Sequence, residues 1–136
     1  MSARRWKARV LAAALVLPLA LLVVTPARLA AWIGRRRPSA DPPPPDPDFA
    51  EWTDRVLGQL PPPWRRNCLR RSVVLYYLLR RAGRSVVMHL GVRRDAAGVL
   101  NAHAWLSRDG LPLLEPPDGH AASYRILASF PPAGAS

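Results

Sequence analysis

Cys68 is the only cysteine of the chain, and it stands at the head of an apolar segment, NCLRRSVVLYYLLRR, that begins at Asn67. A thiol is a nucleophile only as its thiolate, and the first turn of a helix favours that anion through its partial positive charge and unpaired N–H groups. Four arginines lie within three residues of Cys68 and would strengthen this field if they point the same way. Cysteine is also a small apolar residue common in protein cores, so Cys68 alone indicates no particular chemistry.

His103 supplies a second group, because a cysteine beside a histidine is the minimal activated nucleophile. It lies in NAHAWL, a β-prone stretch whose alternation puts His103 and Trp105 on one face together with Val99 and Asn101. The two alanines that flank the histidine leave room for a cysteine on a facing helix to approach. A single histidine in a strand is more often a core residue, so the prediction depends on its pairing with Cys68.

A third group would have to hold the imidazole in one tautomer, and two carboxylates further along the chain could do so. If RDG forms a three-residue hairpin loop, Glu115 lies opposite His103 and shares its face. If the turn consists of DG alone, the register slips by one residue, so that Glu115 faces Ala104 and points away. Glu115 is therefore the first candidate and Asp118 the second, with a backbone or unassigned partner as the remaining alternative.

The other two histidines, His89 and His120, are expected to be structural or solvated. Cys68, His89 and His103 could in principle bind a metal ion, yet the sequence holds no close C-x-x-C or H-x-x-x-H pair to seed such a site. Acyl transfer by a thiol needs no metal or organic cofactor, and none is expected.

The segment that carries Cys68 is predicted to be a central helix. It runs from Cys68 to about Ala82, with Asn67 as the capping residue and Gly83 as the terminator. Residues 73–79 are apolar on every side of such a helix, which a surface helix would not tolerate.

The elements around this helix predict an α+β fold. A short amphipathic helix precedes it, with Asp48 as N-cap, Glu51 at the third helical position and prolines from Pro61 onward as its end. Four β-prone runs follow it, separated by turn residues: SVVMHLGVRR, VLNAHAWLS, LPLL and YRILASF. One buried helix followed by an antiparallel meander belongs to the α+β class.

Composition divides the 136 residues into four parts. They are a hydrophobic, membrane-associated segment at 1–34, a proline-rich linker at 35–47, the domain that carries the chemistry at 48–130, and a tail at 131–136. The stretch from Val10 to Ala27 has no charge and is just long enough, as a helix, to cross a bilayer. A membrane anchor is the first interpretation of this segment, and a cleaved signal peptide or a helical hairpin packed on the domain are the alternatives.

The net charge of +11 would ordinarily suggest an anionic partner. Nearly all the basic residues are arginines scattered in pairs, without the interleaved aromatic residues or glycine-rich loops of RNA-binding modules. A compositional bias explains the charge equally well, and no nucleic-acid partner is expected.

Taken in order, CLRRSVVLYYLLRRAG, VVMHLGVRRD, NAHAWL, DGLPLLE and YRILASF resemble the transglutaminase-like, papain-related fold. In particular, residues from Pro61 to Phe130 resemble the lasso-peptide leader peptidases, the McjB-like proteins. The resemblance implies a cysteine-bearing helix packed on a small antiparallel sheet, preceded here by the N-terminal hydrophobic helix. It also implies a cysteine peptidase that removes the leader from a ribosomally made precursor peptide, with Cys68 as nucleophile, His103 as base and Glu115 as third member.

The same resemblance implies partners. A partner cyclase would close the macrolactam after leader removal, and a separate leader-recognition protein would act in trans, since this chain has no room for that domain. Because the substrate emerges from the ribosome, the catalytic part would be membrane-attached on the cytoplasmic side.

A mechanism follows from the residue types. Cys68 would attack a peptide carbonyl, and His103 would take the thiol proton and later give one to the leaving amine. The oxyanion would lie near the backbone N–H of Cys68, with the side chain of Asn67 as a further donor that its capping role explains equally well. Two other classes are weighed against this one: a catalytically silent peptide-binding scaffold of the same fold, and a binder of anionic lipid or nucleic acid.

Overall fold

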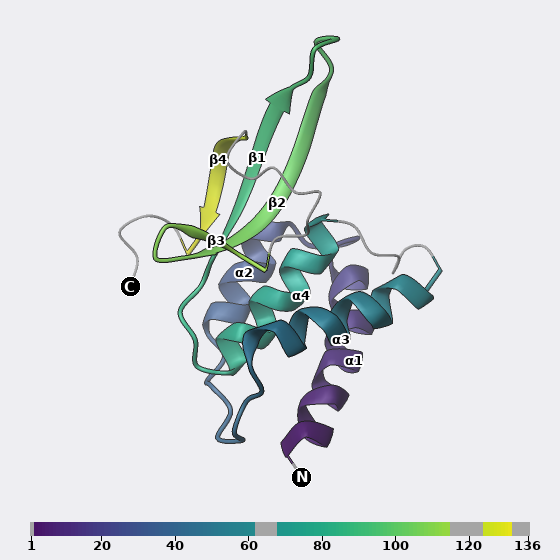
Figure 1. Cartoon of the computed structure of the whole chain (residues 1–136), viewed down its shortest axis with the longest axis vertical. Helices are drawn as coiled ribbons and strands as arrows, with labels where there is room; N and C mark the ends of the chain where they lie inside the picture. Colours follow the sequence, from purple (N-terminus) through teal and green to yellow (C-terminus); the bar gives the residue numbers. More distant parts are fainter. Residues whose placement is uncertain (1, 62–67, 115–123, 132–136) are drawn as a thin grey trace.

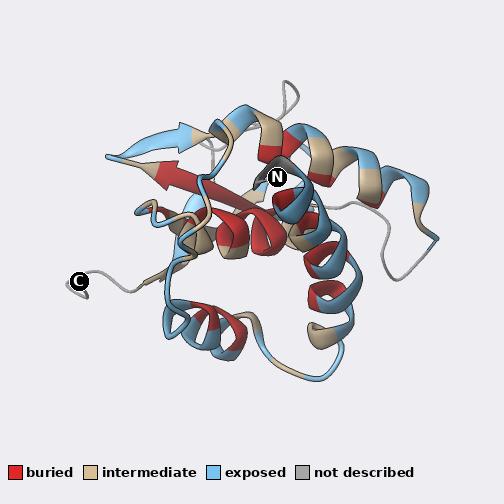
Figure 2. Ribbon diagram, turned by 90° about the horizontal axis from the view of Figure 1, so that it is seen from below, coloured by how far each residue is buried: buried red, intermediate tan, exposed pale blue. Residues whose placement is uncertain are grey.

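Helix α4 (Cys68–Arg81) lies at the centre of the protein in a computed structural model that describes residues 2–61, 68–114 and 124–131. It contacts the helices α1 (Ser2–Ala20), α2 (Pro26–Gly34) and α3 (Asp46–Gln59), and also the sheet (Figure 1). Its six most buried side chains are at most 1% exposed: Val73, Val74, Leu75, Tyr76, Leu78 and Leu79. Figure 2 shows these buried turns beneath the strands. The central helix predicted from the sequence is confirmed, and it ends before Gly83, which has a φ of +79°.

The sheet has four antiparallel strands in the order β3-β2-β1-β4. They are β1 (Val87–Arg94), β2 (Leu100–Arg108), β3 (Leu111–Leu113) and β4 (Arg125–Phe130). The first three form the predicted meander, whereas β4 pairs with the other edge of β1 rather than continuing beside β3. Met88 and Leu106 face each other across β1 and β2 and join the same core as α4, which confirms the α+β class.

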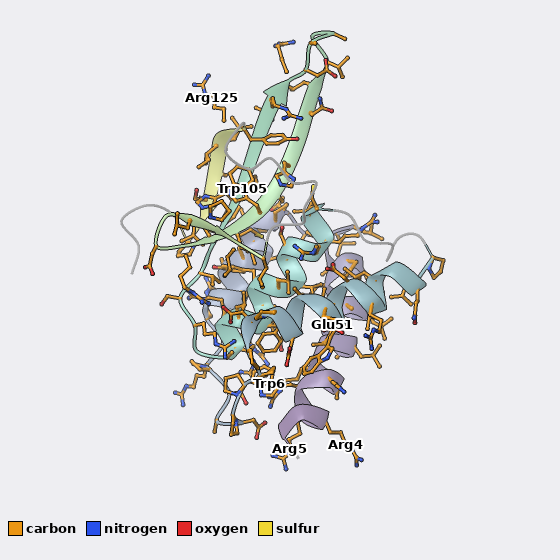
Figure 3. All side chains as sticks on the ribbon, viewed as in Figure 1. Arg4, Arg5, Trp6, Glu51, Trp105 and Arg125 are labelled. Atoms are coloured by element: carbon orange, nitrogen blue, oxygen red, sulfur yellow. The ribbon has the colours of Figure 1, made fainter. Side chains whose placement is uncertain are left out.

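The N-terminal segment is packed on the domain. Trp6, Val10 and Leu17 recur along one side of α1, are at most 4% exposed and belong to the core that α4 shares. Figure 3 shows Trp6 turned inward from α1, while Arg4 and Arg5 point outward at its tip. Among the described residues, no helix has the length and apolar character that crossing a membrane requires. The pair α1 and α2 corresponds to the helical hairpin that was the third alternative.

The proline-rich stretch is held against the helices it connects. Asp41 accepts hydrogen bonds from Arg9 at 2.8 Å and from Arg5 at 3.0 Å, and these bonds lower the pKa of Asp41 below its ordinary range. The indole N–H of Trp6 donates to the carbonyl of Pro42 at 2.9 Å. The stretch therefore closes over one end of α1, as a structured connection.

Helix α3 begins three residues earlier than the sequence predicts. Its first residue is Asp46, with Pro45 at the N-cap, so Asp48 is not the capping residue. The carboxylate of Asp46, the first residue of the helix, forms ion pairs with Arg84, after α4, and with Arg108, on β2. An acidic side chain in the first turn is also favoured by the helix dipole. Asp46 thus ties α3 to the segment that follows α4 and to β2.

His89 links three strands on the face of the sheet away from α4. Its Nε2 lies 2.6 Å from the hydroxyl of Ser107 on β2, and its Nδ1 lies 2.8 Å from the hydroxyl of Ser129 on β4. Burial lowers the pKa of His89 from its ordinary value of 6.5, because the charged imidazolium is poorly solvated there. This confirms the structural reading of His89, and its two serine partners fix the register of β1 with both neighbours.

Gly91 is required by a close approach within the sheet. A Cβ at this position would lie 2.8 Å from the carbonyl oxygen of Arg125 and 2.8 Å from Cη2 of Trp105. The ring of Trp105 therefore rests on the backbone of β1, in space that only glycine leaves open.

We predict that Gly91→Ala destabilises the protein by about 1–3 kcal/mol, because the added methyl group must displace an indole ring and a strand carbonyl. Gly58→Ala is the matched control, since a Cβ at Gly58 in α3 meets nothing within 4 Å and should stabilise the helix by about 0.5–1 kcal/mol. Denaturant unfolding measures both. Equal and small effects of the two substitutions would contradict the close approach at Gly91.

We predict that part of the loss of stability on acidification comes from His89. Because its folded-state pKa is lowered, the unfolded chain binds the proton more readily, so this contribution is complete above about pH 6.5 and is lost as the pH falls below it. His89→Gln should therefore flatten the fall in unfolding free energy between about pH 7 and pH 5. Parallel curves for the two proteins in denaturant titrations would show that His89 is not buried as described.

Candidate active site

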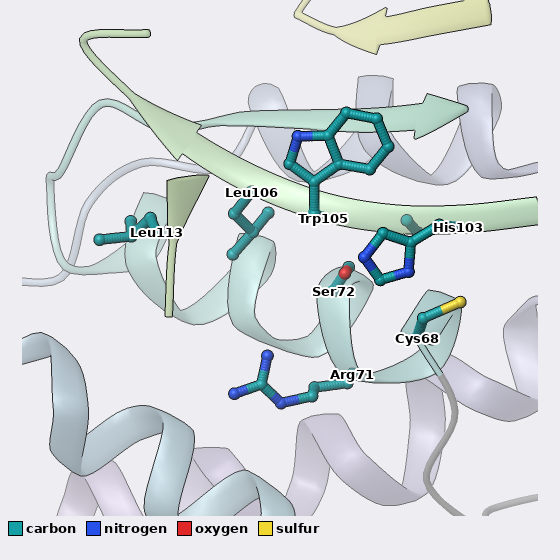
Figure 4. A pocket seen from close by; sticks show the side chains of 8 residues that line it. Cys68, Arg71, Ser72, His103, Trp105, Leu106 and Leu113 are labelled. Carbon is teal, nitrogen blue, oxygen red and sulfur yellow. The ribbon is translucent and has the colours of Figure 1, made fainter. Parts of the chain in front are cut away.

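Cys68 is the first residue of α4, and it lines a small pocket together with His103 of β2 (Figure 4). The pocket has a volume of about 20 Å³, the space of roughly one water molecule. Cys68 is partly exposed, whereas the turns that follow it are buried in the core. The thiol is thus fixed at the rim of the domain by a helix that cannot shift without disturbing the core.

His103 reaches this pocket from β2, a strand whose outer edge is paired with β3 over only part of its length. Leu106 points to α4, and Trp105 points to the opposite face, as the alternation along β2 requires (Figure 4). In the described part of the chain, β3 pairs only with Leu106–Arg108, so His103 lies beyond the end of that pairing. The imidazole therefore lies at the edge of β2 that β3 does not cover, beside the start of α4.

Aromatic rings hold the imidazole of His103. It stacks on Trp105 at a centroid distance of 5.5 Å and an interplanar angle of 17°, and it meets Tyr124 at 5.0 Å. Tyr124 in turn lies under the guanidinium of Arg93 at 4.7 Å. Since Trp105 rests on Gly91, the position of the imidazole depends on the backbone of β1 as well as on β2. The sequence placed Trp105 on the face of His103 and gave no sign of Tyr124, which directly precedes β4 on the other side of β1.

Arg71 does not add to the positive field at Cys68. Its guanidinium points away from the thiol toward α3, where its Nε donates to Asp54 at 2.7 Å (Figure 4). Ser72, one helical turn after Cys68 and 3% exposed, lines the pocket instead. Sequence reasoning missed Ser72, although its spacing of four from Cys68 puts it on the same helical face.

The hairpin between β2 and β3 has the two-residue turn, not the three-residue loop that would place Glu115 opposite His103. Leu111 pairs with Arg108, and the two residues between them, Asp109 and Gly110, have φ of +53° and +81°. Positive φ at both positions is the usual geometry of a two-residue hairpin turn. Glu115 itself lies outside the described residues, as do the other predicted contributors Asp118 and Asn67. The third member of the site therefore stays a prediction.

The histidines do not gather into one site. His89 lines a separate pocket on the far face of the sheet, and His120 lies outside the described residues. Within the part of the chain that the structure describes, no group of three or more histidine, cysteine or acidic side chains is placed to hold a metal ion.

What the arrangement can do is nucleophilic chemistry. A thiol and an imidazole border the same small space, the thiol at a helix start and the imidazole held between aromatic rings. Such a pair can pass a proton from sulfur to nitrogen while the sulfur attacks an electrophilic carbon in the pocket.

Comparison with protein-family models matches residues 4–129 to a family described as the transglutaminase-like superfamily. No curated protein and no solved structure gives a match. The matched residues begin within α1. The family match therefore starts well before Pro61, the first residue of the resemblance identified from the sequence. The predicted membership is thereby confirmed at the level of the superfamily, which includes cysteine peptidases, while leader removal is a narrower prediction. The chain belongs to the transglutaminase-like superfamily.

Proposed function

We propose that this protein is a cysteine peptidase that removes the leader from a ribosomally made, lasso-type precursor peptide. One observation carries the proposal: Cys68 at the start of α4 and His103 at the margin of β2 line the same pocket. Membership of a superfamily that includes cysteine peptidases supports the reaction class. The resemblance of the motifs from Cys68 to Phe130 to leader peptidases supports the substrate class.

The proposed reaction has two halves. In the first, the thiol proton of Cys68 passes to His103 as sulfur bonds to the scissile carbonyl carbon, and the imidazolium then protonates the leaving amine as the C–N bond breaks. In the second, His103 takes a proton from water, whose oxygen attacks the thioester and releases Cys68. The oxyanion of each tetrahedral intermediate would lie near the backbone N–H of Cys68. Glu115 is proposed to orient His103 because the family resemblance implies it, since the two-residue turn removes the hairpin argument for it. Asp118 is the alternative.

Partners enter the proposal through the substrate. The precursor peptide would be presented by a separate leader-recognition protein, and the freed core peptide would pass to a macrolactam-forming cyclase, both acting in trans. These steps belong on the cytoplasmic side of the membrane, because the precursor leaves the ribosome there.

We predict that iodoacetamide alkylates Cys68 faster at mildly acidic pH than it alkylates a free thiol. An ordinary free thiol has a pKa of about 8.5 and is mostly protonated at such pH. His103→Ala should slow this labelling at least about tenfold at pH 6.5, with a smaller effect at alkaline pH, where any thiol ionises. His89→Ala is the matched control and should leave the rate unchanged, because His89 lines another pocket.

Labelling can be followed by the intact mass of the chain. A rate that needs alkaline pH in all three proteins would favour the alternative function, a silent peptide-binding scaffold of the same fold. Loss of rate in His89→Ala as well as His103→Ala would assign the effect to folding.

Association with a membrane is proposed as surface contact through α1 and α2. Seven large apolar side chains of these helices and the turn between them are between 37% and 86% exposed: Leu11, Leu15, Val16, Leu19, Leu22, Val23 and Trp32. We call this set the apolar corner. Basic side chains border it, with Lys7 one turn before Leu11 on α1 and the guanidinium of Arg36 at 4.9 Å from the ring of Trp32. Exposed apolar side chains bordered by cations match the interface of an anionic lipid surface.

We predict that the full chain sediments with vesicles of phosphatidylcholine and phosphatidylglycerol, more weakly with phosphatidylcholine alone, and less at high salt. Val23→Glu should reduce binding to the mixed vesicles severalfold, because Val23 is 86% exposed in the apolar corner. Val99→Glu is the matched control, since Val99 is 56% exposed on the distant β1–β2 hairpin. Equal sedimentation of both variants would contradict a lipid contact at the apolar corner.

A further inference from the structure

A second, larger pocket opens on the face of the sheet that is turned away from α4. Its volume is about 380 Å³, within the range of small-ligand sites. Its walls are apolar and its base is polar, and the residues used here are Trp105, Tyr124, Pro112, Ile126, His89 and Ser107. Trp105 lines both this pocket and the pocket of Cys68 and His103. Neither the family match nor the reaction assigns a role to this pocket.

The base of this pocket is a hydrogen-bonding surface without formal charge. Because burial lowers the pKa of His89, its imidazole is neutral at neutral pH. The ring engages Ser107 through Nε2 and Ser129 through Nδ1, so one serine donates to the ring and the other accepts from it. A hydroxyl keeps spare acceptor capacity after donating, and Ser107, at 7% exposed, lines the pocket. Among the described residues that line the pocket, none carries a charged side chain.

The walls favour an aromatic occupant. The rings of Trp105 and Tyr124 lie 6.2 Å apart and the rings of His89 and Trp105 lie 5.4 Å apart, so a planar group entering between them meets aromatic surfaces. Aromatic pairs are stabilised beyond their buried area. A cationic group would approach the guanidinium of Arg93, which already covers Tyr124. An anionic group that reaches the base would lose its hydration, and the base has no charge to replace it.

We propose that this pocket binds an aromatic side chain of the peptide substrate, with tyrosine as the best fit because its hydroxyl can reach the polar base. The proposal rests on the proposed peptidase function, which requires an extended peptide to run past Cys68. Ser107 lies four residues after His103 on β2, roughly 13 Å along the strand. The aromatic residue should therefore lie within about four positions of the bond that Cys68 attacks.

The test uses the full chain carrying Cys68→Ala, so that binding is measured without reaction. The probes are blocked hexapeptides of serine and glycine that contain one tyrosine, one lysine or neither. By calorimetry, the tyrosine peptide should bind at least about tenfold more tightly than either of the others. Ile126→Lys should abolish this preference by placing a charge in the pocket, whereas Leu127→Lys should preserve it. Both positions are exposed on β4, at 50% and 65%, and only Ile126 lines the pocket.

A second measurement relates the pocket to Cys68. In the wild-type chain, a saturating concentration of the tyrosine peptide should slow alkylation of Cys68 severalfold, and it should not do so in Ile126→Lys. Equal affinity for the three peptides, retained preference in Ile126→Lys, or no protection of Cys68 would each overturn the proposal. Slow, alkaline alkylation of Cys68 would speak against the peptidase alone, since the calorimetric preference does not depend on the thiol.

Discussion

Burial of α4 on all sides is the constraint on which the rest of the structure depends. A helix that is apolar around its whole circumference is stable only when other elements cover every face, and here three helices and the sheet do so. Its first turn is partly exposed, and that turn carries Cys68. The same packing that buries six of the seven side chains from Val73 to Leu79 thus presents a single thiol at a fixed point of the rim. A nucleophile positioned in this way needs little further ordering before it reacts.

The imidazole of His103 is positioned by a different set of contacts, which connect neighbouring strands of the sheet. Trp105 lies on Gly91, His103 stacks on Trp105, and Tyr124 closes the other side. These contacts join β1, β2 and the segment before β4. The indole of Trp105 also forms a wall of the larger pocket, so the group that holds the base and the surface proposed to recognise the peptide share a side chain. Binding and chemistry would be coupled through that ring.

Much of the fold could be predicted from the sequence because the strongest patterns are local. The apolar run after Cys68, the glycine that follows it and the alternation around His103 gave the central helix and the strands. The edge of β1 that β4 occupies could not be predicted, because strand periodicity carries no information about partners. The uncharged stretch from Val10 was interpreted first as a membrane anchor, since its length suits a bilayer and a buried helix equally. In α1 the spacing of Trp6, Val10 and Leu17 indicates which side of the helix is buried. The sequence analysis considered only the lack of charge in this stretch and did not use that spacing.

For the site, the sequence brought Cys68 and His103 together, and the structure places both on one pocket. Ser72 and Tyr124 were missed because their contributions depend on which helical face and which strand meet in space. The sequence allowed either a two-residue or a three-residue turn at Asp109 and Gly110. The positive φ of both residues corresponds to the two-residue turn.

The most direct test is whether Cys68 accepts an acyl group with the help of His103. The full chain would be mixed with a peptide p-nitrophenyl ester, and the release of p-nitrophenol and the intact mass would be recorded together. The account predicts a burst stoichiometric with the chain and an acyl adduct that maps to Cys68, both lost in Cys68→Ala and strongly slowed in His103→Ala. Acylation at other side chains, or the same burst in Cys68→Ala, would contradict it.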